Sequence, residues 1–223
     1  MHLTKDAENK FKNYTIKKVK NNRVLALGLG GILGPAVSKS DDGGLSWNSS
    51  VSGIDPDSSG NVSVEDISVS PNGTIYIVSR QNGGVYASTN NGDTWLEKAK
   101  GVSGGALWSV LAIDDNTIIV GASNGIYRST DAGSNWTRVL NTSSSSSYVM
   151  TMKKNSIGTI YAGLASGIVR KSVNGGLTWT NTSIGDTKSA VYDIEIDNDD
   201  NIYVCFFNSV IGVYNKSEVI TTF

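Results

Sequence analysis

Hydrophobic and β-branched residues recur along the chain in short runs that alternate with polar positions and end at turn residues. Residues 67–70, 74–78 and 84–88 predict three successive strands, and the same succession recurs within 109–140 and 149–182. No stretch has the 3.6-residue period of an amphipathic helix. This pattern predicts an all-β fold.

One octapeptide pattern, Ser-x-Asp/Asn-x-Gly-x-x-Trp, occurs four times, at residues 40–47, 88–95, 129–136 and 172–179. The first serines lie 48, 41 and 43 residues apart, which indicates an internal repeat. Ser and Asp or Asn fold the backbone back on itself, and Gly supplies the positive φ of a tight turn. The Trp then begins the next strand as an apolar anchor, a role expected of Trp136. Four strands per repeat of about 40–45 residues are typical of a β-propeller blade.

The repeats predict a single β-propeller domain at residues 14–223, preceded by an N-terminal tail or edge segment at residues 1–13. The five predicted four-stranded blades are 14–50, 62–98, 107–141, 147–182 and 190–223, of which the last lacks the octapeptide. A ring that closes with five blades predicts a monomer. The alternative is a fragment of a ring of about six to eight blades. The two unpaired edges of such a fragment would make the chain associate.

The octapeptides resemble the Asp-box, or BNR repeat, of sialidases, sortilin-type receptors, xyloglucan-cleaving glycosidases and photosystem assembly factors. The resemblance covers residues 14–182 and implies a propeller. It implies little about function, because the box lies away from the ligand face in the family's enzymes, and a fold does not define an activity. Families with this box are mostly found outside the cytoplasm. The expected location is therefore extracellular or periplasmic, although the first residues carry no apolar signal-peptide segment.

Composition disfavours several classes of protein. Lys and Arg total 19 and Asp and Glu total 20, so the formal net charge of −1 argues against a nucleic-acid partner. The single cysteine, Cys205, permits no internal disulfide. With His2 as the single histidine, a Ser-His-Asp triad or a multi-histidine zinc site is not expected. No apolar run reaches the roughly 18–20 residues of a membrane helix, so no membrane insertion is expected.

A site that resembles those of sialidases would contain three arginines that bind a carboxylate, a Tyr/Glu nucleophile pair and an Asp that acts as acid and base. The five arginines of this chain are Arg23, Arg80, Arg128, Arg138 and Arg170. In the repeat register, four of them map towards the octapeptide side or the outer strands, and only Arg80 falls in a loop on the opposite face. Three converging arginines are therefore not expected, and Arg128 and Arg170 are expected to be ordinary exposed strand residues.

The mouth of the central channel offers a different candidate site. Glu65, Trp108, Tyr148 and Tyr192 are predicted to be equivalent positions at the start of the innermost strands. Each lies two residues before a predicted core position, namely Ile67, Val110, Met150 and Ile194. Together with Arg80 they form the predicted ligand-binding site, since aromatic rings stack on sugars or clasp cations and a carboxylate binds hydroxyl groups. The alternative is that the aromatic rings only fill the narrow end of the ring.

Catalysis and metal binding are not expected at this mouth. A glycosidase needs two carboxylates that face one site. Glu65 has no carboxylate at the equivalent positions, and Asp66 and Asp193 are predicted to alternate to the other face of their strands. The acidic residues at 197–200 resemble only a fragment of a calcium loop, so neither a metal nor a cofactor is predicted.

These features predict a non-catalytic propeller that binds a glycan or a protein at its channel mouth or loop face. Two alternatives remain open. One is a degenerate or truncated glycoside hydrolase of the sialidase type. The other is a protein scaffold similar to the assembly factors.

Overall fold

The computed structural model describes residues 15–19, 22–28, 36–80, 83–99, 102–103, 105–142, 147–185, 189–207, 211–214 and 220–222. Within these residues, twenty strands form five antiparallel sheets of four strands each. The strands of each sheet pair in chain order, so every blade is an up-and-down meander. The tail expected at residues 1–13 lies outside the described residues.

The strand bounds follow the repeat. The first blade comprises β1 (Ile16–Lys18), β2 (Val24–Leu27), β3 (Val37–Ser40) and β4 (Asn48–Ser49). The second comprises β5 (Asp66–Val69), β6 (Ile75–Val78), β7 (Val85–Ser88) and β8 (Leu96–Ala99). The third comprises β9 (Leu107–Ala112), β10 (Ile118–Ala122), β11 (Gly125–Ser129) and β12 (Thr137–Asn141). The fourth comprises β13 (Val149–Lys154), β14 (Ile160–Leu164), β15 (Ile168–Ser172) and β16 (Thr180–Gly185). The fifth comprises β17 (Val191–Ile196), β18 (Ile202–Phe206), β19 (Ile211–Tyr214) and β20 (Ile220–Thr222).

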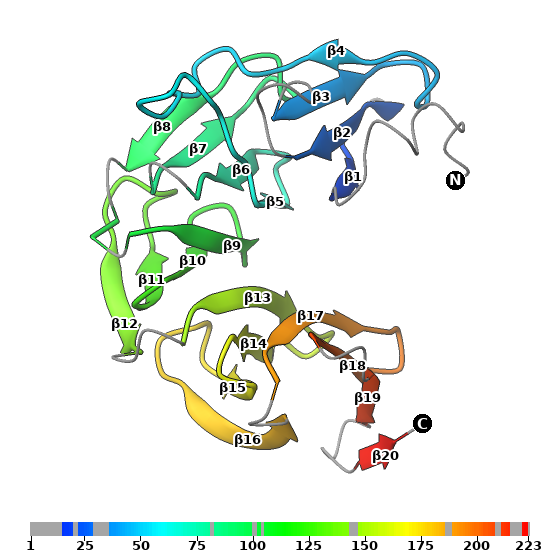
Figure 1. Cartoon of the computed structure of the whole chain (residues 1–223), viewed down its shortest axis with the longest axis vertical. Helices are drawn as coiled ribbons and strands as arrows, with labels where there is room; N and C mark the ends of the chain where they lie inside the picture. The colour runs from blue at the N-terminus through cyan, green and yellow to red at the C-terminus, as the bar shows by residue number, and fades with distance from the viewer. Residues whose placement is uncertain are drawn as a thin grey trace.

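The blades stand around a central axis with the first strand of each blade innermost (Figure 1). Strand β5 contacts β9, β9 contacts β13 and β13 contacts β17, so the second to fifth blades meet along their inner strands. This architecture is a β-propeller of five four-stranded blades. The predicted fold class and number of blades are confirmed.

Apolar side chains between neighbouring sheets hold the blades together. The described residues contain four buried apolar clusters. One lies between the first and second blades, one between the second and third, one between the third and fourth, and one between the fourth and fifth. The fit is close at Gly163 in the middle of β14, where an added Cβ would lie 2.3 Å from Cγ1 of Val191 in the next blade. A side chain at residue 163 would therefore push the fourth and fifth blades apart, which explains a glycine inside a strand.

The four octapeptides form turns between the third and fourth strands of their blades, and we call them the octapeptide turns. In the third turn, Ser129 Oγ donates to Asp131 Oδ1 at 2.7 Å, and the Gly133 amide donates to Ser129 Oγ at 2.9 Å. The Asn135 amide donates to Asp131 Oδ1 at 2.8 Å. The same three hydrogen bonds recur in the other turns at 2.8–3.0 Å. The two polar residues thus satisfy the turn amides, as expected from their side chains.

The four tryptophans of these turns differ in burial. Trp95 is 5% exposed, whereas Trp47, Trp136 and Trp179 are half-buried. The indole nitrogens of the half-buried three donate to a glycine carbonyl of their own turn at 3.0–3.1 Å. The most deeply buried anchor is therefore Trp95 rather than Trp136.

Candidate functional site

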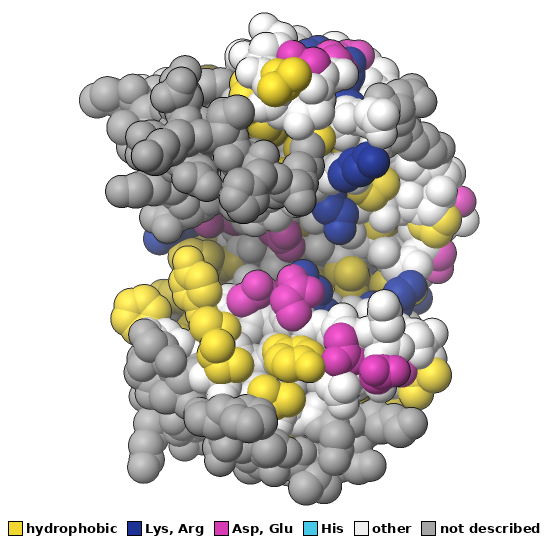
Figure 2. Space-filling model, turned by 90° about the vertical axis from the view of Figure 1, so that its right-hand side faces the viewer, with side chains coloured by type: hydrophobic (Ala, Val, Ile, Leu, Met, Phe, Trp, Pro, Cys, Tyr) yellow, Lys and Arg dark blue, Asp and Glu magenta, His cyan; other side chains and the backbone are white. Residues whose placement is uncertain are grey.

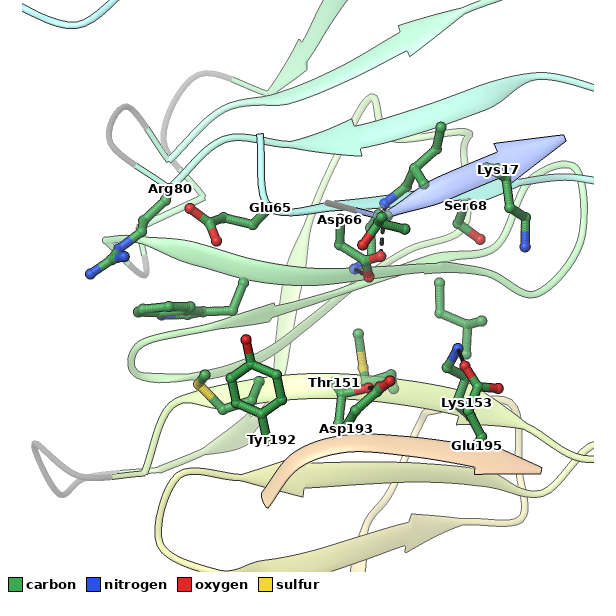
Figure 3. A pocket seen from close by; sticks show the side chains of 17 residues that line it. Lys17, Glu65, Asp66, Ser68, Arg80, Thr151, Lys153, Tyr192, Asp193 and Glu195 are labelled. Atoms are coloured by element: carbon green, nitrogen blue, oxygen red, sulfur yellow. Dashed lines mark hydrogen bonds and ion pairs between the residues drawn. The ribbon is translucent and has the colours of Figure 1, made fainter. Parts of the chain in front are cut away.

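A cavity of about 530 Å³ lies among the innermost strands. Its walls come from β5, β9, β13 and β17, with Thr15 and Lys17 from the first blade and Arg80 from the loop after β6. Figure 3 shows the labelled side chains distributed along it, from Arg80 at one end to Lys17 at the other. The residues at the first end, called the mouth residues below, are Glu65, Arg80, Trp108 and Tyr192.

The mouth brings together side chains from three blades. The guanidinium carbon of Arg80 lies 4.3 Å from the centroid of the Trp108 ring, within the range of a cation–π contact. Tyr148 stacks on the same indole, with ring centroids 5.6 Å apart and planes inclined by 11°. Ser63 Oγ donates to Glu65 Oε1 at 3.0 Å. Four of the five residues predicted for the site therefore line one cavity, and Tyr148 contacts one of them.

The repeat register of the fourth blade differs from the prediction by two residues. Val110 pairs with Val120 in the third blade, and the equivalent pair in the fourth is Met152 with Ala162. Met152 is the buried core residue, so Met150, which lines the cavity, is the equivalent of Trp108. The predicted equivalence of Tyr148 was wrong. Met150 and Met152 are both apolar and lie two residues apart, so the hydrophobic pattern alone did not distinguish the two registers.

Asp66 and Asp193 line the cavity, although alternation was expected to turn them away from it. The alternation itself is present, because Asp66 pairs with Val78 on one face of the sheet while Ile67 pairs with Ile77 on the other. An innermost strand has no neighbouring strand on the channel side, however. Side chains from both faces of such a strand therefore border the channel, and the expectation was wrong.

Asp66, Ser109, Thr151 and Asp193 occupy equivalent positions, and we call them the inner clasp. Three hydrogen bonds from this set cross blade boundaries: Val110 N to Asp66 Oδ2 at 2.9 Å, Ser109 Oγ to Val149 O at 3.0 Å, and Thr151 Oγ1 to Asp193 Oδ1 at 2.9 Å. Sequence reasoning did not identify this set as part of the channel. The repeat could have identified these residues, because each member of the inner clasp directly follows a predicted channel-mouth position or its equivalent, such as Glu65 or Trp108.

The inner clasp has a distinct electrostatic environment. Burial raises the pKa of Asp66 to about 6, and the charge of Asp193 acts in the same direction. The amides of Val110 and Ile67 and the charge of Lys153 oppose this shift without cancelling it. The carboxyl group of Asp66 therefore gains its charge near pH 6 rather than near pH 4.

Lys153 and Glu195 form an ion pair at the other end of the cavity, with an N–O distance of 2.6 Å. Burial alone would lower the pKa of Lys153. The hydrogen bond and charge of Glu195, together with the charges of Asp193 and Asp66, outweigh burial and raise that pKa. Lys153 therefore stays cationic and balances part of the acidic lining.

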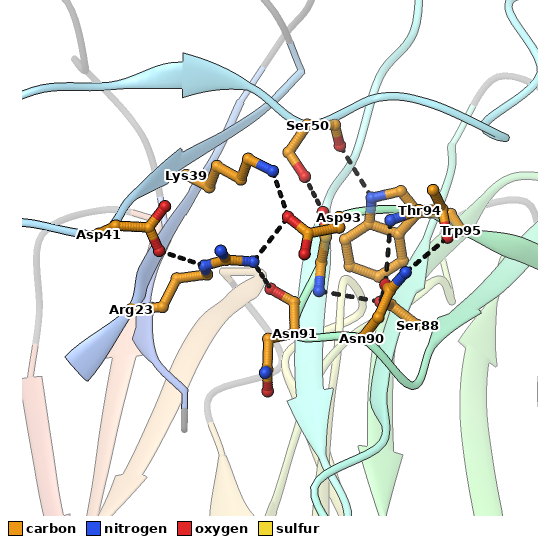
Figure 4. Close-up of polar contacts among 11 residues, drawn as sticks. Arg23, Lys39, Asp41, Ser50, Ser88, Asn90, Asn91, Asp93, Thr94 and Trp95 are labelled. Carbon is orange, nitrogen blue, oxygen red and sulfur yellow. Dashed lines mark hydrogen bonds and ion pairs between the residues drawn. The ribbon is translucent and has the colours of Figure 1, made fainter. Parts of the chain in front are cut away.

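The arginines do not converge on the cavity. Arg23 lies on the octapeptide side, where its Nε donates to Asp41 Oδ1 at 2.5 Å and its Nη1 to Asp93 Oδ1 at 2.8 Å (Figure 4). Lys39 also pairs with Asp93, and these two cations hold the pKa of Asp93 below its ordinary value. Arg23 thus joins the first blade to the octapeptide turn of the second.

Arg128 also lies on the octapeptide side. Its Nε donates to the carbonyl oxygen of Gly175 in the octapeptide turn of the fourth blade at 2.8 Å. Arg128 therefore bridges two blades, rather than being the ordinary exposed strand residue that was expected. Arg80 is the single arginine among the residues that line the cavity, which does not match a three-arginine carboxylate site.

The acidic turns have structural partners. Asp197 Oδ1 accepts hydrogen bonds from the amides of Asp199 and Asn201, both at 2.9 Å. Within the described ranges, no group of three or more His, Cys, Asp or Glu side chains could hold a metal ion. The same part of the chain contains no helix long and apolar enough to cross a bilayer.

The fold and the central cavity define a β-propeller with a candidate binding site at its channel mouth, and comparison with known proteins adds relatives of this class. No family model matches the chain. Photosystem II assembly lipoprotein Ycf48 of Synechococcus sp. (strain CC9902) is 29% identical over 172 residues, covering 76% of this chain and 50% of that protein. A xyloglucanase of Paenibacillus sp is 27% identical over 174 residues, covering 62% of this chain and 17% of that protein. The chain thus spans half or less of the curated relatives it matches.

Solved propellers share the arrangement of the blades. Ycf48 from Cyanidioschyzon merolae superposes with a TM-score of 0.68 at 18% identity, covering 93% of this chain and 70% of that one. A structure described as Ycf48 bound to D1 peptide has a TM-score of 0.65 at 15% identity, covering 95% and 72%. Virginiamycin B lyase from Staphylococcus aureus has a TM-score of 0.73 at 14% identity, covering 93% and 68%. At these identities the likeness concerns the fold alone.

Proposed function

We propose that this propeller is a non-catalytic binding module that takes an extended segment of a partner protein at its channel mouth. The observation that carries the proposal is the convergence of Glu65, Arg80, Trp108 and Tyr192 at one end of one cavity. Together they offer a cation, a carboxylate and aromatic surface within reach of a single ligand. Concave sites with a few convergent polar groups are the usual binding sites of propellers and other folds.

The mouth suits a peptide better than a sugar ring. A sugar stacks on an open aromatic face, but the Trp108 ring already contacts the guanidinium of Arg80 and the ring of Tyr148. The guanidinium held there is a rigid fork of donors that matches a carboxylate or a peptide carbonyl. Tyr192 is 57% exposed and supplies aromatic surface for an apolar side chain.

The comparisons support a protein partner over a glycan. One relative is named as an assembly lipoprotein, and one similar structure is described as holding a peptide. We extend the binding of a protein segment to this chain. The proposal also takes the octapeptide turns as a form of the Asp-box and places the protein outside the cytoplasm. Fractionation of cells that express the chain tests the location.

A peptide array and a glycan array, each probed with the purified chain, test the proposal. We expect binding to a subset of peptides, lost in Arg80→Ala and weakened at least tenfold in Tyr192→Ala. Arg138→Ala is the matched control, because Arg138 is an exposed arginine on β12 outside the cavity. Glycan binding without peptide binding, or peptide binding that survives Arg80→Ala, would overturn the proposal.

A glycoside hydrolase is the second candidate, favoured by the two carboxylates of Asp66 and Asp193 on one cavity. A carboxyl group with its pKa raised to about 6 is suited to act as a general acid beside an ionised partner. Against this role, Ile67 N and Val110 N donate to the two oxygens of Asp66, so both are engaged by the backbone. Hydrolysis of xyloglucan or of a sialoside that is lost in Asp66→Asn and Asp193→Asn would favour this candidate.

A further inference from the structure

Charged side chains of both signs lie around the hollow between the upper and lower halves of the molecule (Figure 2). At the mouth, Glu65 and Arg80 have opposite charges and come from neighbouring segments, since Glu65 N donates to Val78 O at 3.0 Å. Both side chains lie at the same end of the cavity (Figure 3). Within the described part of the chain, however, neither forms an ion pair. The other end of the cavity differs, because Lys153 and Glu195 are paired there.

The guanidinium of Arg80 is held by an aromatic ring instead of a carboxylate. Its central carbon lies 4.3 Å from the centroid of the Trp108 ring. That ring is fixed in turn, because its nitrogen donates to Ser123 Oγ at 3.3 Å and Tyr148 stacks on it. Arg80 makes no hydrogen bond within the described residues, so the N–H donors of its guanidinium are available to a ligand.

The carboxylate of Glu65 has a neutral partner. Ser63 Oγ donates to Glu65 Oε1 at 3.0 Å, and Ser63 is only 3% exposed, so this hydroxyl group is fixed by its surroundings. Among the residues that the structure describes, none donates to Glu65 Oε2. A carboxylate accepts several hydrogen bonds, and Glu65 therefore keeps capacity for a donor from a ligand.

The position of both charged groups depends on the middle of the chain. Glu65, Arg80 and the residues that hold them belong to the second, third and fourth blades. These blades meet along their innermost strands, β5 with β9 and β9 with β13. The arrangement therefore does not depend on the residues at either end of the chain.

A ligand with a single charge meets repulsion at this mouth. A carboxylate that binds Arg80 lies near the carboxylate of Glu65, and a cation that binds Glu65 lies near the guanidinium. Like charges brought together cost affinity and exclude the wrong partner. A ligand with both charges avoids the repulsion and adds charge-assisted hydrogen bonds at both groups. The mouth therefore favours a ligand that carries both signs of charge.

We infer that the partner segment carries a carboxylate and a cationic group close together, with the carboxylate bound by Arg80 and the cation by Glu65. This inference rests on the proposed function, because it assigns a charge pattern to the segment that the mouth binds. The planar guanidinium binds a carboxylate through two parallel hydrogen bonds, which favours a carboxylate over a peptide carbonyl at Arg80. Acidic and basic side chains or the ends of the partner chain supply the two charges.

Double-mutant cycles between the protein and a peptide test the two pairings. The probe is the tightest binder from an array of peptides with blocked ends, in which the positions of Asp, Glu, Lys and Arg vary. Arg80→Gln should weaken binding at least about tenfold, and much less once the acidic residue of the peptide is replaced by its amide. Glu65→Gln should behave in the same way towards replacement of the basic residue by glutamine. Arg138→Gln is the matched control and should leave every affinity unchanged, since Arg138 lies outside the cavity on β12.

The crossed combinations separate charge pairing from a loss of structure. Arg80→Gln combined with loss of the basic residue should give independent losses, and each variant should still bind its matching neutral peptide, which shows that it folds. If only peptides with a free end bind and the same cycles hold for that end, the partner's terminus supplies the charge. Peptide binding without a preference for charge, or without coupling in either cycle, would overturn this inference and leave the proposed binding module intact. No binding to any peptide would overturn the proposed function, and the inference with it.

Discussion

The indole nitrogen of Trp95 donates a hydrogen bond of 2.8 Å to the main-chain carbonyl oxygen of Ser50, across the boundary between the first and second blades. Ser50 Oγ in turn donates to the carbonyl oxygen of Gly92 in the same octapeptide turn (Figure 4). The other octapeptide tryptophans instead bond within their own turns. The tryptophan of the second octapeptide turn therefore links two blades, unlike its equivalents in the other turns.

Trp95→Ala is expected to destabilise the protein by about 3–5 kcal/mol, as for other large buried aromatic residues. The loss combines a cavity between two blades with an unsatisfied carbonyl group of Ser50. Chemical denaturation with fluorescence detection measures the free energy of unfolding. Trp136→Ala is the matched control and should cost clearly less, because Trp136 is half-buried and bonds within its own turn. Equal losses in the two variants would contradict this interpretation.

Gly163→Ala is expected to cost about 1–3 kcal/mol through overpacking, since the new Cβ would meet Val191 of the next blade. The double variant Gly163→Ala/Val191→Ala should lose less than the sum of the two single variants, because removing the Val191 methyl groups removes the closest of the contacts that the new Cβ would make. Thermal or denaturant unfolding of all four proteins measures this coupling. Additive losses would mean that the close approach of these blades is not what excludes a side chain at residue 163.

Asp131 should make the stability of the third octapeptide turn depend on pH in the acidic range. Hydrogen bonds from Asn135 and Ser129 lower its pKa to about 2, below its ordinary value near 3.9. A lowered pKa contributes stability that is present above about pH 4 and is lost as the pH falls towards 2. Asp131→Asn, which copies the Asn of the second and fourth turns, should therefore differ most from wild type above pH 4. Melting temperatures from pH 2 to 7 test this.

The reciprocal variant serves as the control for that experiment. Asn174→Asp places a carboxylate at the equivalent position of the fourth turn, where Thr178 N already donates to the side-chain oxygen at 2.9 Å. The Asn174→Asp variant should be more stable than the wild type above pH 4, and it should lose this added stability as the pH falls towards 2. If the two exchanges gave the same dependence on pH, the carboxylate would not be the group responsible.

Asp66 should have the opposite dependence on pH. Its pKa in the folded protein is about 6, so the charged form is disfavoured by folding. The protonated form stabilises the fold at low pH, and this contribution is lost as the pH rises from about 4 through 6. The stability of wild type relative to Asp66→Asn should therefore fall over that range. Unfolding by denaturant at pH 4.5, 6 and 7.5 measures it, and Ser109→Ala, at the equivalent position, should keep the pH dependence of the wild type.

Local chemistry explains why most of the fold was predictable from the sequence. The turns carry their own hydrogen-bonding residues, such as Ser129 and Asp131, and therefore form in the same way wherever the octapeptide occurs. Alternation of polar and apolar residues then defined the strands between them. The mouth was largely predictable for the same reason, because equivalent positions of a repeat meet at the same height of the ring.

Other features depended on packing between blades, which the period of one strand does not encode. Met150 and Met152, two apolar residues at alternate positions, left two registers open in the fourth blade, and contact with neighbouring sheets selected the one that buries Met152. Both faces of an innermost strand border the channel, so Asp66 and Asp193 entered the cavity in spite of correct alternation.

The sequence by itself determined the all-β class, the four-stranded blade, the number of blades and the position of the turns, because these depend on interactions within one repeat. The tertiary structure alone decided which tryptophan joins two blades and which carboxylates reach the channel. These features depend on the curvature of the ring and on contacts between repeats, which arise only when the blades assemble around a common axis.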